Sequence, residues 1–234
     1  MGDWQPVMGL PLWAWIFVAP TALAALLWAT RPRTLLRPVW RILDAVYTGA
    51  GVLAAFFMMV ILGLIVAQMV ARWSGVTFPG STAFAGYAMA ATSFFALAHA
   101  LTHGAHIRVS ILLNANAFTR RWLNAAAMLV AAITATYFAR FAIKTNFISE
   151  MLNDRTQETD KVPEWLLTAV TMLGTWPWEW GDLWARSGSE WVFTPVWLPQ
   201  LPMSVGTVLL AVALWDYLVR LLVDDRRIEA ESVE

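Results

Sequence analysis

Residues 45–71 read AVYTGAGVLAAFFMMVILGLIVAQMVA, a stretch that contains no charged side chain. A helix that crosses a lipid bilayer needs about 20 mainly apolar residues, and this stretch exceeds that length. A soluble domain of this size could not bury so much apolar surface. The stretch therefore predicts a membrane-spanning helix.

Three further apolar runs are long enough to cross a membrane, and each is flanked by charged residues or tryptophan, as membrane helices usually are. They cover residues 84–107, 122–143 and 197–223. With 45–71 they predict an all-α membrane protein with four core transmembrane helices. The order along the chain then leaves one long connection, between the third and fourth spans.

A fifth apolar run lies near the N-terminus, at residues 12–29. It carries no charge, but it is short and Pro20 stands in its middle. Because proline is tolerated in membrane helices, we expect an extra N-terminal transmembrane helix here. The alternative is a helix that lies in the membrane interface. No basic segment precedes the run, so it does not resemble a cleavable signal peptide.

The composition agrees with a membrane protein and excludes several other classes. Apolar residues make up 59% of the 234 residues and charged residues 14%, against about 45–50% and about 25% in soluble domains. The formal net charge of zero argues against nucleic-acid binding. The chain has no cysteine, which excludes disulfides and thiolate catalysis. No nucleophile–histidine pair or phosphate-binding loop is present, and we expect no catalytic residues, cofactor or metal.

The connection at about 145–195 is polar at first and then rich in tryptophan. Its segment 165–184, WLLTAVTMLGTWPWEWGDLW, is interrupted by Gly174 and Pro177. The apolar part before the interruption is too short to span a bilayer, so we expect a short helix on the membrane surface or on a partner. A fifth full span is the alternative. The tryptophans fit anchoring at the water–lipid interface or docking of a partner protein.

Arginines are concentrated in alternate connections, before the first core span, between the second and third, and after the fourth. Short connections rich in Lys and Arg remain in the cytoplasm. This predicts a cytoplasmic C-terminus and a periplasmic insert at about 145–195.

All three histidines, His99, His103 and His106, lie near the end of the second span, at a spacing that places them on one helical face. One interpretation is a haem or metal-ligand face. No histidine exists elsewhere to face them across the bundle, and this span contains no carboxylate. The other interpretation is that they mark the polar end of the helix.

The segment 98–113, AHALTHGAHIRVSILL, resembles the second-helix signature of the small membrane subunit of TRAP (tripartite ATP-independent periplasmic) transporters. Ser110 stands where the family usually has Asp. A second segment, TPVWLPQLPMSVG at 194–206, resembles the start of the last helix in that family. The matching positions are Gly104, His106, Ile107, Arg108, Val109, Leu112, Leu113, Pro195, Trp197, Pro199, Met203 and Gly206.

The resemblance covers about residues 41–222, with three departures. The acidic residues usual before the second helix are missing, the insert is longer, and the N-terminal extension is not part of the usual small subunit. We therefore expect three parts: an N-terminal extension at 1–38, a small-subunit-like membrane domain at 39–222, and a charged cytoplasmic tail at 223–234.

The resemblance implies a scaffold subunit in the bacterial inner membrane, in contact with membrane lipids. It would pair with a large permease subunit and a periplasmic solute-binding protein. The complex would import an organic acid or similar solute by ion-gradient-driven transport. The alternative function is a membrane anchor of a respiratory complex that binds haem through His99, His103 or His106.

Overall fold

The computed structural model describes residues 6–7, 9–30, 33–103, 117–157, 159–172 and 174–223. Within this part of the chain, four helices are long and apolar enough to cross a membrane. They are α2 (Arg33–Trp73), α3 (Ser81–Thr102), α5 (Ala117–Met151) and α8 (Trp197–Val223). Each contains one of the four predicted core spans or most of it, so the four-helix prediction is confirmed.

Two of the helices are longer than their apolar runs. Helix α2 begins at Arg33, so it includes residues on both sides of position 38, and it contains Pro38 near its start. Helix α5 continues to Met151, although the apolar run stops at residue 143. The extra turns of α5 carry the polar residues Asn146 and Ser149. Ser149 is buried, and Asn146 contacts α8, so packing extends this helix beyond its hydrophobic part.

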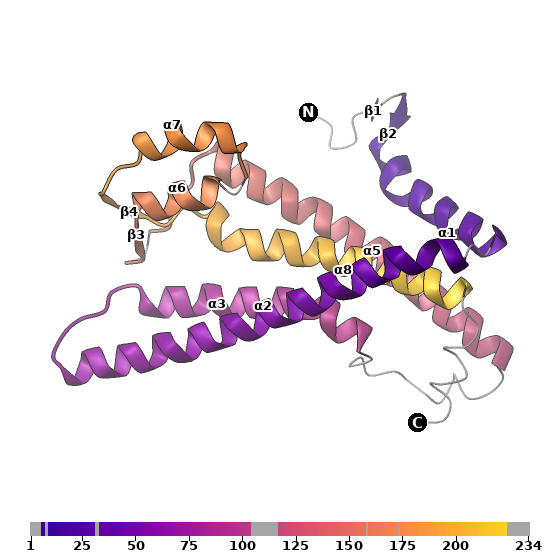
Figure 1. Cartoon of the computed structure of the whole chain (residues 1–234), viewed down its shortest axis with the longest axis horizontal. Helices are drawn as coiled ribbons and strands as arrows, with labels where there is room; N and C mark the ends of the chain where they lie inside the picture. The colour runs from indigo at the N-terminus through magenta and orange to yellow at the C-terminus, as the bar shows by residue number, and fades with distance from the viewer. Residues whose placement is uncertain are drawn as a thin grey trace.

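The helices pack side by side in the order α2, α3, α8, α5, because α3 contacts both α2 and α8, and α8 also contacts α5 (Figure 1). Most core residues are alanines, which allow helices to approach closely. The central cluster contains Tyr47, Ala98, Leu101, Ala132, Ala135, Ala139, Ala211, Ala213 and Leu214. In the most apolar 18-residue stretch of α8, half of the residues are buried, against 11% in the corresponding stretch of α2. Helix α8 is therefore the centre of the bundle and α2 its most exposed member.

The N-terminal segment begins with a two-stranded hairpin, β1 (Pro6–Val7) and β2 (Leu10–Pro11). The helical turns η1 (Ala14–Val18) and α1 (Ala19–Thr30) follow, and α1 packs against α8. The helix predicted at 12–29 is present. It is shorter than the four long helices, and a membrane crossing by it stays a prediction.

The connection between α5 and α8 folds into a small unit, residues 154–196, which we call the cap. Strand β3 (Lys161–Pro163) pairs antiparallel with β4 (Trp191–Phe193). Between the strands lie α6 (Glu164–Met172), η2 (Pro177–Glu179) and α7 (Trp180–Ala185). Figure 1 shows α6 and α7 beyond the ends of α5 and α8. The short helix predicted here is confirmed as α6, and it ends before Gly174 and Pro177.

Candidate functional site

Charged side chains from α2 and α8 form a network at one end of the bundle. The Arg220 guanidinium donates from Nε to Oδ1 of Asp216 at 3.0 Å, and its Nη2 lies 2.8 Å from Oδ2 of the same carboxylate. The same Nη2 lies 2.8 Å from Oδ1 of Asp44 on α2. Paired contacts between a guanidinium and a carboxylate are strong and directional. Arg220 therefore links the two helices through charge-assisted hydrogen bonds.

Two aromatic residues of α2 complete this network. The Tyr47 side chain is almost fully buried, and its hydroxyl donates to Oδ2 of Asp216 at 3.4 Å. The Arg220 guanidinium lies 5.4 Å from the centroid of the Trp40 ring, and Nη2 also donates to the Trp40 carbonyl at 3.3 Å. Arg220 thus contacts two consecutive turns of α2, at Trp40 and Asp44, and Asp216 contacts the next turn at Tyr47.

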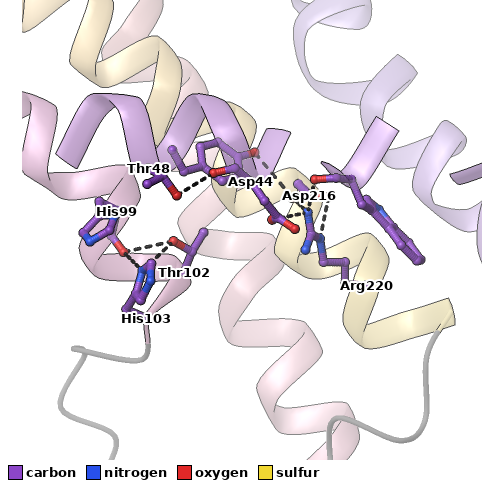
Figure 2. A network of polar contacts seen from close by, with 9 residues as sticks. Asp44, Thr48, His99, Thr102, His103, Asp216 and Arg220 are labelled. Atoms are coloured by element: carbon purple, nitrogen blue, oxygen red, sulfur yellow. Dashed lines mark hydrogen bonds and ion pairs between the residues drawn. The ribbon is translucent and has the colours of Figure 1, made fainter. Parts of the chain in front are cut away.

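A polar cavity of about 230 Å³ adjoins the network. It is lined by Asp44, Thr48, Thr102, His103, Ala213, Asp216, Tyr217 and Arg220. Figure 2 shows His99, Thr102 and His103 at the end of α3, close to this group. The network contains two carboxylates and one guanidinium, so its formal charge is −1. The hydroxyl groups that line the cavity can hydrogen-bond to water molecules.

Two of the histidines, His99 and His103, lie at the C-terminal end of α3. Helix α3 ends at Thr102, and His103 follows as its C-terminal cap. Its ring Nδ1 lies 3.0 Å from the His99 carbonyl oxygen, and the two imidazole rings are 4.0 Å apart between centroids. Among the described residues, no group of three or more His, Asp or Glu could hold a metal ion. His106 lies outside the described residues.

In the sequence, Asp216 and Arg220 are two charges near the end of the fourth span. Their four-residue spacing inside an apolar helix was the available signal, because it places both side chains on one face. The role of Asp44 and Tyr47 was not visible, since they are about 170 positions away from Asp216 in the chain.

Asp160 joins the cap to the helix bundle. The Tyr87 hydroxyl of α3 donates to Asp160 Oδ2 at 2.7 Å, and the Thr156 hydroxyl lies 3.0 Å from Oδ1. The Asp160 carbonyl accepts from both the backbone N–H and the hydroxyl of Thr194, which is fully buried. The cap is thus attached at its base to the start of α3 and to the segment that leads into α8.

Gly80, the N-terminal cap of α3, allows this attachment. Its φ of 76° lies in the left-handed region, which favours glycine. A Cβ at this position would lie 2.7 Å from the Asp160 Cα. Only a glycine lets the two backbones come this close.

Asp160 also makes the cap sensitive to acid. Burial acts to raise the pKa of its carboxyl, but hydrogen bonds from Tyr87 and Thr156 outweigh that effect and hold the pKa below the ordinary value of 3.8. A carboxylate with a depressed pKa stabilises the folded state above its unfolded-state pKa, and this stabilisation disappears as the pH falls through the folded-state pKa. The attachment should therefore be intact at neutral pH and weaken only below about pH 4.

We expect Asp160→Asn to weaken the attachment by about 2 kcal/mol at pH 7, since hydrogen bonds to a charged group contribute about 1.5–3 kcal/mol. Hydrogen exchange of the cap amides between pH 7 and pH 3 measures this. Protection in the wild type should fall below pH 4, whereas protection in the variant should be lower and less dependent on acid. Asp182→Asn, at an exposed carboxyl of α7, is the matched control. Equal protection in all three proteins would contradict the role of Asp160.

The second family motif lies at the junction of the cap and α8. Pro195 is fully buried and pairs with Arg155 in an isolated bridge. The Trp197 carbonyl accepts a hydrogen bond from Asn146 Nδ2 at 2.8 Å. Pro199 lies in the first turn of α8, where proline is tolerated.

Gly206 marks a close approach of α8 to α3. A Cβ there would meet the Phe94 carbonyl oxygen at 2.6 Å. Four motif residues therefore serve the start of α8 and its packing: Pro195, Trp197, Pro199 and Gly206. The first motif, Gly104, His106, Ile107, Arg108, Val109, Leu112 and Leu113, lies outside the described residues.

Residues 61–177, half of the chain, match the model of the family described as "Tripartite ATP-independent periplasmic transporters, DctQ component". The chain belongs to this family. The match includes the first motif and ends before the second. No curated protein and no solved structure matches the chain.

Membership of the DctQ family makes this chain a component of a TRAP transporter, and with its four apolar helices it is a multi-pass membrane protein. The recognition of the family from its motif is confirmed. The DctQ family is one of transporter components and not of enzymes, and it gives no support to the haem-anchor alternative. The ion-pair network and the cap, which Asp160 attaches to the helix bundle, are thus features of a transporter subunit.

Proposed function

We propose that this chain is the scaffold subunit of a TRAP transporter in the bacterial inner membrane. In this role it packs against a large permease subunit and stabilises it, and its cap binds a periplasmic solute-binding protein. The complex imports an organic acid, and an ion gradient drives the import. The observation that carries the proposal is the contrast between α8, which is enclosed by its own chain, and α2, which is not. The alternation of basic connections supports a periplasmic cap and a cytoplasmic ion-pair network.

The face of α2 that the described part of the chain leaves uncovered fits a partner helix. Residues three and four apart lie on one helical face, and we define the α2 stripe as Gly49, Val52, Phe56, Met59, Gly63 and Val66. The four side chains other than glycine are at least half exposed. A Cβ at Gly49 or Gly63 would meet nothing within 4 Å. Glycines in an exposed stripe permit a second helix to approach closely, and we infer that this helix belongs to the large permease subunit.

The test is co-purification of the large subunit with the tagged small subunit. We expect the double variant Gly49→Leu/Gly63→Leu to reduce the recovered large subunit about tenfold, which corresponds to about 1.4 kcal/mol of binding free energy. The reason is that leucine side chains would hold the partner helix away from α2. Leucine should not harm the chain itself, because both positions are open.

Gly86→Leu is the matched control, because Gly86 is an equally open glycine on α3. It should leave co-purification unchanged. Recovery of the large subunit at the wild-type level with the double variant would refute the α2 stripe as the contact face.

The cap carries an exposed aromatic surface suited to a protein partner. Trp176 and Trp178 are 65% and 72% exposed, and their rings stack 5.0 Å apart. Trp180 has a different role, because its Nε1 donates to the Met172 carbonyl at 2.9 Å and so joins η2–α7 to the end of α6. Exposed tryptophans are frequent hot spots of protein interfaces, and the attachment at Asp160 holds them in place.

We expect Trp176→Ala/Trp178→Ala to leave assembly intact and to slow uptake several-fold at low concentrations of the binding protein. Excess binding protein should restore the rate, because truncation of a hot spot costs about 2 kcal/mol of affinity. Uptake by reconstituted complex over a range of binding-protein concentrations measures this. Poor insertion, or an equal loss of uptake at every concentration, would instead make these tryptophans membrane anchors.

A further inference from the structure

The β3–β4 hairpin of the cap has one apolar face that remains exposed. In this antiparallel pair, Lys161 lies opposite Phe193 and Pro163 lies opposite Trp191. Side chains alternate between the two faces of a strand, so these four residues share one face, which we call the strand face. The other face carries Val162, which is buried. Trp191 and Phe193 are 66% and 42% exposed, although the outer face of an antiparallel pair is usually polar. The described part of the chain therefore leaves the strand face largely uncovered.

The base of the hairpin is attached to the start of a membrane-spanning helix. Asp160 directly precedes β3, and its carboxylate accepts a hydrogen bond from Tyr87 in the second turn of α3. The Gly80 backbone N–H donates to the Thr159 hydroxyl at 3.1 Å. Helix α3 has 22 residues, so it is about 33 Å long, close to the hydrocarbon thickness of about 30 Å. Its start, and the base of β3 with it, therefore lies at the level of the lipid headgroups.

The neighbouring end of α2 supports this depth. Helix α2 ends at Trp73, which is strongly exposed, and Arg72 before it is exposed as well. Phe78, in the connection from α2 to α3, is also exposed. Arginine and tryptophan at the end of a span are typical of the water–lipid interface. This connection leads into Gly80, which lies against the backbone of Asp160, so the interface extends to the base of the hairpin.

The strand face and the exposed tryptophan pair occupy different parts of the cap. Figure 1 shows β3 and β4 on the side of the cap toward α3, and α7 on the opposite side. Trp176 and Trp178 lie at η2, directly before α7. The two groups of exposed aromatic residues can therefore serve two different contacts, one close to the ends of the long helices and one farther from them.

The charges around the strand face fit lipid headgroups. The Lys161 Nζ atom lies 5.0 Å from the centroid of the Phe193 ring, and Nη1 of Arg155 donates to the Phe193 carbonyl at 3.1 Å. Among the described residues beside the strands, Asp154 and Glu190 are exposed carboxylates. The two signs of charge are thus balanced, which does not favour a strongly charged protein partner. A zwitterionic headgroup carries a phosphate and an ammonium group, and so matches both signs.

We propose that the strand face lies in the headgroup region of the bilayer. The rings of Trp191 and Phe193 contact the upper part of the acyl chains, and the Lys161 ammonium contacts lipid phosphates, as long cationic side chains do at membrane surfaces. The membrane then holds the cap at a second place besides Asp160. This contact with lipid goes beyond the proposed transport function and does not depend on it.

The absence of cysteine from the chain makes a direct test possible. Trp191→Cys, Phe193→Cys and Trp178→Cys are each labelled with a nitroxide, and the full chain is reconstituted in phosphatidylcholine nanodiscs. Power saturation then compares collisions of the label with oxygen, which concentrates in the bilayer, and with a water-soluble nickel chelate. We expect the ratio of oxygen to nickel collisions to be several-fold higher at positions 191 and 193 than at position 178.

Lys161→Glu in the Trp191→Cys background tests the contact with phosphates. Lipid phosphates repel a carboxylate, so the ratio at position 191 should fall several-fold. Arg186→Glu in the same background is the matched control, because Arg186 is an exposed cation at the end of α7, and it should leave the ratio unchanged. An unchanged ratio in the Lys161→Glu variant would refute the contact of Lys161 with the headgroups.

Equal ratios at positions 191 and 178 would overturn the proposal, since the strand face would then lie in water. The same measurement on the complex assembled with the large subunit distinguishes lipid from protein. A ratio at position 191 that stays high supports the proposal, whereas a loss of oxygen collisions on assembly would overturn it, because a partner protein would then cover the strand face. None of these results depends on transport, since uptake is not measured.

Discussion

Asp216→Ala should lower the free energy of unfolding by about 3 kcal/mol, one of the two largest effects that we expect from a single substitution. The carboxylate of Asp216 accepts two contacts from Arg220 and one from the Tyr47 hydroxyl. Removal of one member of a buried ion pair leaves the other charge without its partner, which typically costs about 3–5 kcal/mol. Because Asp44 stays beside Arg220, the lower end of that range is expected.

Unfolding by titration with sodium dodecyl sulfate measures this effect in micelles or bicelles. Asp44→Ala should cost less, because the Asp44 side chain is 52% exposed, against 6% for Asp216. The double variant Asp216→Leu/Arg220→Met should recover much of the loss, since an apolar pair of similar volume can replace a buried ion pair with little cost.

Co-purification with the large subunit should follow stability in this series, because the network holds α2, which carries the proposed contact face. If Asp216→Ala and Asp44→Ala were equally mild, the network would be a solvated surface feature and not a clamp between α2 and α8.

Gly206→Ala should be the other strongly harmful substitution, with a loss of about 1–3 kcal/mol from overpacking. The added Cβ would lie 2.6 Å from the Phe94 carbonyl oxygen and 2.7 Å from the carbonyl carbon. These are backbone atoms in the middle of α3, which cannot move aside as a flexible side chain does. Helices α3 and α8 would have to separate, and the alanine-rich contacts along them would be lost.

Gly63→Ala is the matched control, since its Cβ would meet nothing within 4 Å. Alanine is favoured over glycine in helices by about 1 kcal/mol, so this variant should be neutral or slightly more stable. Thermal unfolding in detergent compares the two variants. A Gly206→Ala protein as stable as Gly63→Ala would show that the α3–α8 contact can relax.

The glycines also show where sequence reasoning reached its limit. Gly49, Gly51 and Gly63 share one apolar run, and glycines in such a run favour close helix packing. Within this chain only Gly51 does so, because a Cβ there would lie 2.6 Å from the His99 ring. Gly49 and Gly63 face open space. A hydropathy pattern identifies the helix, but it does not show which face a neighbouring helix covers.

The cap is a second example. Its tryptophans, its short helix and the break at Gly174 and Pro177 could be predicted, because each depends on a few adjacent residues. The β3–β4 pairing and the role of Asp160 could not, since they join residues that lie far apart in the chain. One tryptophan, Trp180, differs from Trp176 and Trp178 in that its indole N–H reaches a backbone carbonyl of α6, and no local pattern reveals that.

The sequence by itself determined the membrane class, the four long helices and the family, because hydropathy over about 20 residues and a local motif are properties of contiguous segments. The tertiary structure decided which charges are paired, which glycines are contact points and which aromatic residues of the cap lie on the strand face. These features depend on side chains brought together from distant segments. Asp44, Asp216 and Arg220 look like ordinary charges at the ends of apolar runs until α2 and α8 pack together. The energy of that packing, and not local propensity, gives them their role.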